Sequence, residues 1–370
     1  MQKLKIDLKN NNDFLSIKKI LQPHTKRAYL VGGCVRNSFL NLPSNDYDIE
    51  IYDIDPLKFD HLMTQLGAKG FGKSFFVYKY KNFDLALARY ENKTSIGHKG
   101  FKVKICNDEK DGAKRRDFTI NALMINIFDY KFYDFYGGLK DLNLKILRHI
   151  NDESFIEDSL RILRAISFAC RFDLNIANTT LALMQNMDIS DLSRERINEE
   201  LCKIFKTSNL DKAYEFFQIL NLEDKIFYYK SYNDQNFKAL LSMSQKYIKD
   251  EALFLYLYLN FFQISKDDFF KKTKIKKEFF KKSEQKFILD KISDFDLATI
   301  ALEFRLCDWL GLWNKERIEQ ARKIRLFDKK FENKICAKDL IKQGYIGKDL
   351  GVKLRESKLE EIKKYLKELA

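Results

Sequence analysis

Two aspartates, Asp46 and Asp48, lie one residue apart where a short alternating segment begins. On a β-strand, side chains two residues apart point to the same face, so the two carboxylates would lie side by side. Like charges at that distance are unfavourable unless a cation lies between them. Mg²⁺ prefers such oxygen ligands and usually shares its coordination shell with substrate phosphates. The pair therefore indicates a magnesium site, although an Asp-x-Asp sequence on its own also occurs in solvated turns.

A glycine pair lies upstream, in the sequence LVGGCVR, where Gly32 and Gly33 separate a short apolar run from an expected helix. Glycines allow backbone N–H groups to approach an anion closely, and the start of a helix favours negative charge. An ordinary tight turn would have the same composition. Followed by an acid pair, however, the loop fits nucleotidyl transfer, in which two metal ions activate a hydroxyl and stabilise the departing pyrophosphate.

Two further charged stretches have both a structural and a chemical explanation. RRDFTIN begins with Arg115 and Arg116, which are compatible with a solvated surface but can also bind phosphate through planar donor forks. In EDSLR, Asp158 and Arg161 would share one face of a helix, and Glu157 would reach Arg161 from one turn away. Such spacing most often marks an ordinary helix salt bridge.

The distribution of Gly and Pro divides the chain into two parts. All three prolines lie in the first 56 residues, and neither Gly nor Pro occurs between residues 139 and 310. Because these residues punctuate strands and turns, the first part should be α/β and the rest nearly all helix. The expected strands are 28–31, 47–52, 75–80, 83–88 and 101–105, and the expected helices are 35–40, 57–66, 118–124, 159–172, 196–205 and 210–220.

The composition limits the class of protein and its partners. A total of 32 Phe and 18 Tyr excludes wholesale disorder, and the longest apolar run, 252–259, is too short to span a bilayer. The net charge of +14 favours a nucleic acid or a membrane surface as partner, unless it only reflects a lysine-rich proteome. The six cysteines form no CxxC pair, and the N-terminus has no apolar signal core, so we expect a cytoplasmic location.

Residues 269–287 interleave Phe and Lys. A basic and aromatic segment can contact RNA. An amphipathic helix with buried Phe and a solvated lysine face explains the pattern as well, and we expect this to be the reason for the Phe residues.

Several stretches together resemble the motifs of the class II tRNA nucleotidyltransferase and bacterial poly(A) polymerase family. They occur in the family's order: GGCVRN…NDYDIEIY, RRDFTINAL, EDSLRILRAISFACRF and RERINEEL. The resemblance is strongest over residues 29–205 and departs at Asn37, where the family usually has Asp. It implies a polymerase-β-like α/β nucleotidyltransferase head at 1–150, followed by an elongated all-α part with a neck at 151–215, a body at 216–330 and a tail at 331–370.

The resemblance also implies roles for individual residues. Asp46 and Asp48 would be the catalytic pair that binds Mg²⁺, and Asp84, on a following strand, would be a third carboxylate unless it is simply an exposed strand acid. The nucleotide would be bound by Gly32, Gly33, Arg36, Arg115, Arg116, Asp117, Asn121, Glu157, Asp158, Arg161 and Arg164.

Within this set, Asp158 and Arg161 would act as an amino-acid template for the base, with Glu157 orienting the Arg. Cytosine and adenine present a donor and an acceptor in the same order on their pairing edges, so an Asp acceptor beside an Arg donor fits both. Guanine and uracil present the reversed order and would leave polar groups unpaired, at a cost of about 1–3 kcal/mol each.

The activity implied by the resemblance is CCA addition: transfer of CMP, CMP and AMP from CTP and ATP to the tRNA 3′ end, with release of pyrophosphate. The helical part would hold the tRNA acceptor arm, and neither a membrane nor a protein partner is indicated. Residues 90–100 are expected to form a mobile loop that controls the change from C to A addition. The alternatives are poly(A) polymerase, an enzyme that adds only CC or only A, and a catalytically inactive RNA-binding protein.

Overall fold

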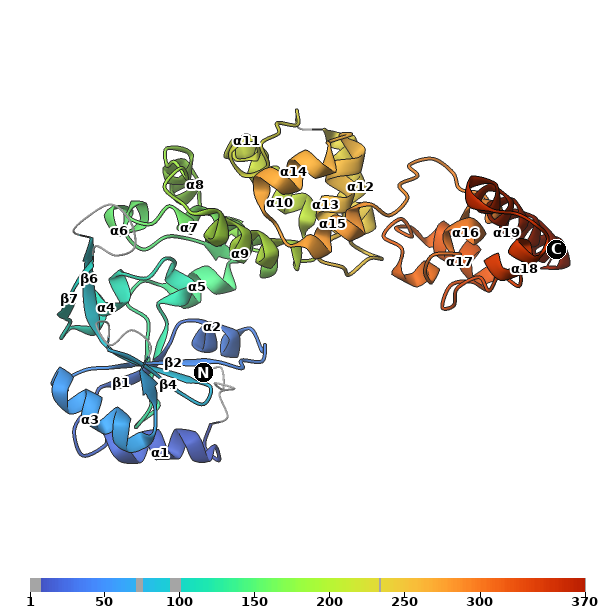
Figure 1. The fold of residues 1–370 in the computed structure, drawn as a ribbon. Coiled ribbons are helices and arrows are strands. Elements are labelled where there is room, and N and C mark those ends of the chain that lie inside the picture. The colour runs from blue at the N-terminus through green and yellow to red at the C-terminus, as the bar shows by residue number, and fades with distance from the viewer. Residues whose placement is uncertain (1–7, 71–75, 94–100, 233, 370) are drawn as a thin grey trace. The chain divides into compact units, whose positions relative to one another are not determined.

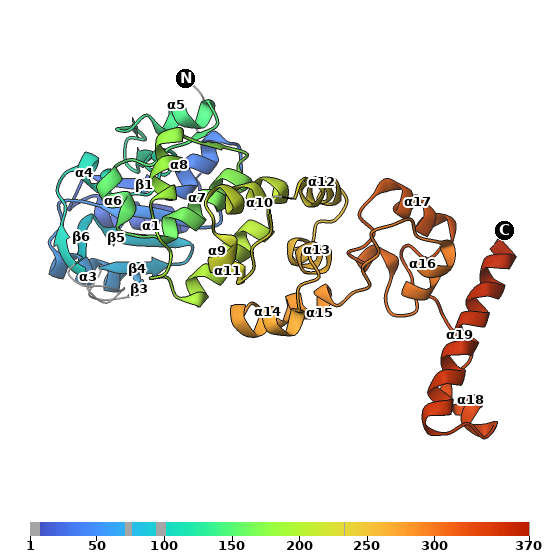
Figure 2. The same ribbon diagram turned by 90° about the horizontal axis from the view of Figure 1, so that it is seen from above.

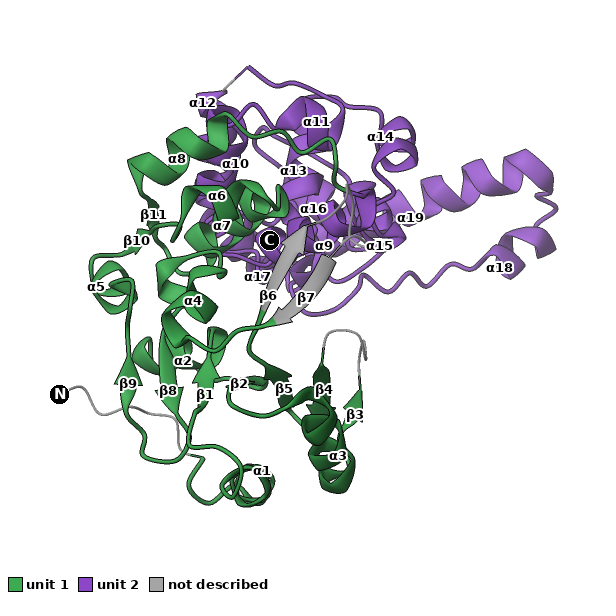
Figure 3. Cartoon of the chain, turned by 90° about the vertical axis from the view of Figure 1, so that its left-hand side faces the viewer, with its two compact units in different colours: residues 1–192 green, residues 193–370 purple. Residues whose placement is uncertain are grey.

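The chain forms two compact units, residues 1–192 and 193–370 (Figure 3). The computed structural model describes residues 8–70, 76–93, 101–232 and 234–369. Within those residues, the first unit combines a sheet with helices, whereas the second contains helices and no strand. The expected fold class, an α/β head followed by an all-α part, is confirmed. The finer division into neck, body and tail stays a prediction.

A seven-stranded sheet is the centre of the first unit (Figure 1). β2 and β5 run parallel, and all other neighbours in this sheet are antiparallel. The strand order is β3 (Lys69–Gly70), β4 (Val77–Tyr80), β5 (Phe83–Leu87), β2 (Tyr47–Ile51), β1 (Ala28–Val31), β8 (Met124–Asn126) and β9 (Phe132–Tyr133). The strands expected at 28–31, 47–52, 75–80 and 83–88 are therefore present, with ends that shift by a residue or two.

The two faces of the sheet differ in polarity because side chains alternate along each strand. Ile49 and Ile51 of β2 are fully buried, in one core cluster with residues of α1 (Asn12–Leu21) and α3 (Pro56–Leu66). Asp48 and Glu50 alternate with them and therefore lie on the opposite face. The sheet thus has one apolar face covered by helices and one face that presents charged side chains.

Local sequence signals fix the ends of α3. The side chain of Asp55 accepts hydrogen bonds from the backbone N–H groups of Leu57 and Lys58, and Pro56 occupies the first helical position. The helix ends at Gly67, whose φ of +78° is in the left-handed region that favours glycine. These caps place α3 so that its apolar side packs against the sheet.

A separate hairpin follows β5. It consists of β6 (Arg89–Lys93) and β7 (Phe101–Ile105), which pair antiparallel. The expectation of a loop over 90–100 is therefore wrong for residues 90–93, which belong to strand β6. The remainder of that expected loop, residues 94–100, lies outside the described residues.

The first unit contains further helices besides α1 and α3, most of them short. They are α2 (Gly33–Phe39), α4 (Glu109–Lys114), η2 (Thr119–Asn121), α5 (Gly138–Asn143), α6 (Asp152–Ile156), α7 (Leu160–Arg171) and α8 (Asn178–Gln185), with a small parallel pair of β10 (Ile146–Leu147) and β11 (Asn175–Ile176). The helix expected at 118–124 is only the 3₁₀ turn η2, because Met124 already pairs with Val31 in the sheet.

Gly138 allows α5 to lie directly against η2. A Cβ atom at this position would come within 2.1 Å of the Thr119 carbonyl oxygen. We expect Gly138→Ala to lower the free energy of unfolding by about 1–3 kcal/mol, because the backbone of η2 must move. Urea denaturation measures the change. The control is Gly351→Ala, where a Cβ would meet nothing within 4 Å, so Ala should stabilise the helix slightly. Equal stability of the two variants would contradict the close packing.

The second unit is a succession of helices. They are α9 (Arg194–Phe205), α10 (Leu210–Ile219), α11 (Glu223–Phe227), α12 (Gln235–Ser244), α13 (Leu253–Phe261), α14 (Lys266–Thr273), α15 (Lys277–Ser283), α16 (Asp294–Ile300), η3 (Leu306–Asp308), α17 (Lys315–Lys323), α18 (Ala337–Lys342) and α19 (Gly347–Leu369). Figure 2 shows α18 beside the beginning of the long helix α19.

The apolar run expected at 252–259 is α13, which is buried on all sides from Leu253 to Leu259. Nowhere in the described part of the chain is a helix both long and apolar enough to cross a membrane.

Most of the interleaved Phe and Lys residues lie on α14 and α15. Phe269 and Phe279 are buried, whereas Lys271, Lys272 and Lys281 are exposed. The expectation of buried Phe beneath a solvated lysine face is confirmed.

Candidate active site

A row of charged side chains crosses the polar face of the head sheet. Asp48 of β2 pairs with Asp84 of β5, and Asp84 pairs with Lys79 of β4. Paired positions on neighbouring strands point to the same face, so these three side chains lie next to one another. The Lys79 Nζ atom is 3.1 Å from Asp84 Oδ1 and 3.2 Å from Asp46 Oδ1. The three carboxylates expected from the sequence therefore lie near enough to act on one another electrostatically, and two of them bind the same ammonium group.

Asp48 lies against the turn that contains Gly32. A Cβ atom on Gly32 would be 3.6 Å from Asp48 Oδ2 and 3.3 Å from the Arg116 Nη1 atom, and the Gly32 φ is +71°. Burial raises the pKa of Asp48, while the nearby Arg116 guanidinium acts in the opposite direction. A glycine is required here both by the backbone conformation and by the close approach of the charged groups.

Arg115 and Arg116 are held by a buried glutamate that the sequence did not single out. Glu50, two residues beyond Asp48 on β2, is only 2% exposed. It accepts hydrogen bonds from Arg115 Nη2 at 2.5 Å and Arg116 Nη2 at 3.1 Å. Burial alone would raise the pKa of Glu50, but the two guanidinium groups outweigh it and lower the pKa to about 2. The arginine pair is therefore fixed beside the carboxylate row and is not a freely solvated surface.

A second group of expected residues forms a buried network at η2. Asp117 accepts hydrogen bonds from Arg164 at 2.6 and 2.9 Å and from Asn121 Nδ2 at 2.8 Å. Asn121 Oδ1 in turn accepts from Arg36 Nη1 at 2.5 Å. Asp117, Asn121 and Arg36 are all less than a tenth exposed. The network connects α2, η2 and α7, which carry residues from three separate motifs.

Arg36 is also enclosed by aromatic rings. Its guanidinium lies 4.4 Å from the centre of the Phe172 ring, and burial lowers the pKa of Arg36 to about 10. The neighbouring Asn37 accepts from Arg36 Nη2 at 2.9 Å and donates to the Pro43 carbonyl at 3.3 Å. Asn at position 37 can therefore act as acceptor and donor at once, which a carboxylate could not do.

The template residues differ in position from the expectation of one continuous helix. Arg161 lies in the first turn of α7, whereas Glu157 and Asp158 lie in the turn between α6 and α7. The helix is interrupted because Asp158 Oδ1 accepts from the Leu160 N–H at 3.3 Å, as a residue preceding a helix does. Arg161 donates to the carbonyls of Ser154 at 2.8 Å and Arg115 at 2.9 Å. Both carboxylates still act electrostatically on the Arg161 guanidinium.

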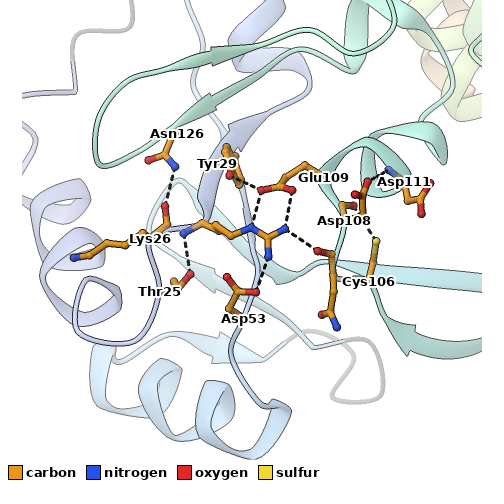
Figure 4. Close-up of polar contacts among 11 residues, drawn as sticks. Thr25, Lys26, Tyr29, Asp53, Cys106, Asp108, Glu109, Asp111 and Asn126 are labelled. Atoms are coloured by element: carbon orange, nitrogen blue, oxygen red, sulfur yellow. Dashed lines mark hydrogen bonds and ion pairs between the residues drawn. The ribbon is translucent and has the colours of Figure 1, made fainter.

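An ion cluster at the far end of β1 and β2 holds α4 in place (Figure 4). Arg27 binds both carboxylate oxygens of Glu109, at 2.6 and 2.7 Å, and Asp53 at 2.7 Å. Tyr29 donates to Glu109 at 2.6 Å. Glu109 begins α4, and Arg115 directly follows the last residue of that helix. The cluster therefore helps to position the arginine pair by holding α4 at its other end.

The Arg27 cluster should make the stability of the head depend on pH. The hydrogen bonds from Arg27 lower the pKa of Glu109 from 4.5 to about 2. The resulting stabilisation is complete above pH 4.5 and is lost as the pH falls through about 2. We expect Glu109→Gln to remove roughly 1–2 kcal/mol of this acid-sensitive stability, after allowance for solvent screening. Urea denaturation at several pH values tests this. Glu153→Gln, on an exposed residue of α6, serves as the control. Its free energy of unfolding should depend on pH as that of the wild type does.

The carboxylate row has the donor set of a divalent metal site. Asp46, Asp48 and Asp84 supply hard oxygen ligands, and the ammonium group of Lys79 already lies between two of them as a cation. The residues present therefore fit a hard divalent cation.

Sequence reasoning missed three residues of the site: Lys79, Glu50 and Arg27. Glu50 carried one usable signal, since it continues the i, i+2 alternation of Asp46 and Asp48. Lys79 and Arg27 carried none, because their partners lie on other strands and elements.

The head sheet, its glycine turn and its carboxylate row all lie within residues 28–148. Residues 28–148 match the family model described as the poly A polymerase head domain. Enzymes of this kind generally use divalent metal ions.

Comparison with individual proteins extends the similarity beyond the head. A multifunctional CCA protein from Nitrosospira multiformis is 38% identical over 185 residues, which are 48% of this chain and 43% of that protein. The match thus spans less than half of the relative's length. A CCA-adding enzyme in complex with ATP has a TM-score of 0.69 at 21% identity, over 96% of this chain and 90% of that one. The CCA-adding enzyme of Thermotoga maritima in complex with tRNA has a TM-score of 0.66 at 21% identity, over 96% and 93%. The chain therefore shares their fold.

Proposed function

We propose that this protein is a CCA-adding tRNA nucleotidyltransferase, which transfers CMP, CMP and AMP from CTP and ATP to the tRNA 3′ end. The observation that carries the proposal is the row of Asp48 and Asp84 beside Gly32, on the sheet of a poly A polymerase head domain. The 38% identity to a protein named as a CCA protein favours tRNA as the acceptor. The shared fold with CCA-adding enzymes is consistent with it.

The proposed reaction is an attack of the tRNA 3′-hydroxyl on the α-phosphorus of CTP or ATP. A new P–O bond to the tRNA forms, the bond to the β-phosphate oxygen breaks, and pyrophosphate leaves. Asp46, Asp48 and Asp84 would hold Mg²⁺, which supplies Lewis acidity and neutralises phosphate charge when bound. The close approach that Gly32 permits lets the triphosphate lie against the backbone, and Arg116, fixed by Glu50, adds positive charge beside Asp48.

Base selection is assigned to Asp158 and Arg161, with Glu157 adding negative charge near the guanidinium. Arg161 is held by two backbone carbonyls, so its remaining donors have a fixed direction. The buried network at η2, with Arg36, Asp117, Asn121 and Arg164, would hold the sugar and phosphates of the nucleotide, together with Gly33 and Arg115.

A cytoplasmic location is part of the proposal. All six cysteines are free thiols, as expected in a reducing compartment.

Poly(A) polymerase is the second candidate, because the head family itself is described by that activity. Enzymes that add only CC or only A use the same residues. An inactive RNA-binding protein would keep the fold, but it would have no need for the carboxylate row.

Products formed on tRNA that ends at the discriminator base distinguish these functions. The protein is incubated with each nucleotide alone and with CTP plus ATP, and the products are sequenced. CCA as the sole full-length product is expected. A long run of A from ATP alone would indicate poly(A) polymerase, arrest at CC would indicate partial addition, and no incorporation would refute the enzymatic proposal.

A further inference from the structure

Lys79 belongs to none of the motifs that identify the head, yet it contacts two of the three carboxylates. It lies on β4, directly opposite Asp84, and its Nζ atom is 3.1 Å from Asp84 and 3.2 Å from Asp46. Asp46 immediately precedes β2, and Asp84 lies on β5. One ammonium group thus connects two segments that are distant in sequence.

This ammonium group lies between two of the carboxylates that are proposed to bind the metal ion. Carboxylates at this spacing repel one another unless a positive charge lies between them, and here that charge comes from the protein itself. Within the described residues, no group of three or more His, Cys, Asp or Glu side chains is already drawn together as metal ligands. The carboxylates of Asp46 and Asp84 are instead turned to Lys79.

The ion pairs of Lys79 are too exposed to contribute much to the free energy of folding. The side chain of Asp46 is 75% exposed and that of Lys79 is 32% exposed. Ion pairs in such surroundings contribute about 0–1 kcal/mol to folding. Removal of the Lys79 charge should therefore leave the head folded and change mainly the electrostatics of the carboxylate row.

We propose that Lys79 is a positioning residue that occupies the cation position between Asp46 and Asp84 in the metal-free protein and is displaced when a divalent ion binds. The inference rests on the proposed function, since it takes these carboxylates as the metal ligands. A like charge within a few ångströms opposes the incoming ion, so Lys79 sets how much metal is required before the site is filled. Lys79 also reduces the repulsion between the carboxylates as long as no metal ion is bound.

The test is a titration with Mn²⁺ alone, followed by electron paramagnetic resonance, in the absence of nucleotide. Lys79→Met keeps the length of the side chain without its charge and should bind Mn²⁺ about tenfold more tightly than the wild type. Lys79→Arg keeps the charge and should bind near the wild-type affinity. The matched control is Lys69→Met, which removes the same charge from an exposed side chain on β3, directly opposite Lys79 but one strand farther from Asp84. Unchanged or weaker binding by Lys79→Met would overturn the proposal.

Asp48→Asn separates this inference from the proposed function. If the wild type binds Mn²⁺ and Asp48→Asn does not, the metal site is real, and the result for Lys79 stands by itself. If no Asp48-dependent site is found, both the metal site and the role of Lys79 are refuted.

Amine labelling gives an independent readout. Acetic anhydride should modify Lys79 more rapidly after Mn²⁺ is added, because the amine is released from its two carboxylates. The rate at Lys69 should not change. A rate at Lys79 that does not respond to Mn²⁺ would show that the amine stays in place, contrary to the proposal.

Discussion

Asp48→Asn should reduce nucleotide incorporation by about three orders of magnitude while leaving the head folded. The substitution keeps the shape of the side chain but removes a charge from the centre of the row between Asp84 and Gly32. A metal ligand of this kind contributes several kcal/mol to the transition state, and each 1.36 kcal/mol corresponds to a factor of ten. Burial raises the pKa of Asp48, which means that the folded head disfavours the ionised carboxylate. The neutral Asn side chain should therefore not lower the free energy of unfolding.

Incorporation of radiolabelled CMP into tRNA measures the loss, and a gel shift with tRNA measures binding, which should change little. The control is Asp55→Asn, which removes the same charge from the exposed N-cap of α3, where Asn caps a helix equally well. Asp55→Asn should retain most of the activity. Comparable activity in Asp48→Asn and Asp55→Asn would refute the assignment of the carboxylate row.

The parts of the site that could be predicted from the sequence are those fixed by local patterns. Two such features are the strand that ends just before Gly32 and the i, i+2 spacing of Asp46 and Asp48. Both depend only on neighbouring residues, and the second follows the period of two of a β-strand. The caps of α3 are equally local, since Asp55, Pro56 and Gly67 each act within one turn of the helix. Such elements can be placed to within a residue or two.

The parts that could not be predicted depend on pairing between distant segments. Lys79 meets Asp84 because of the register of β4 on β5, and Arg27 meets Glu109 across 82 positions in the sequence. The interruption before α7 was missed for another reason. The side chain of Asp158 accepts a hydrogen bond from the Leu160 N–H, so α7 begins only at Leu160 and Asp158 lies outside the helix. A buried salt-bridge network such as that of Asp117 has no periodic signature at all.

Asp158→Asn and Arg161→Met should relax the choice of nucleotide more than they slow the chemistry. Asn at position 158 can present an N–H donor where the carboxylate only accepts, so it can bind the O4 acceptor of uracil. Loss of the Arg161 guanidinium removes the donor that is proposed to bind N3 of cytosine. Each change removes a penalty of about 1–3 kcal/mol against the wrong base, which corresponds to roughly 5–150-fold in discrimination.

The measurement is kcat/KM for CTP and for UTP on tRNA that lacks its last three nucleotides, with the ratio as the readout. Arg171→Met is the control, because it removes the same charge from the exposed last residue of α7. Its ratio should equal that of the wild type. Arg161 also holds the carbonyls of Ser154 and Arg115, so a purely structural role predicts equal losses for CTP and UTP. Equal losses in both variants would therefore contradict the template assignment, whereas a fall in the ratio for both would establish that the protein itself selects the base.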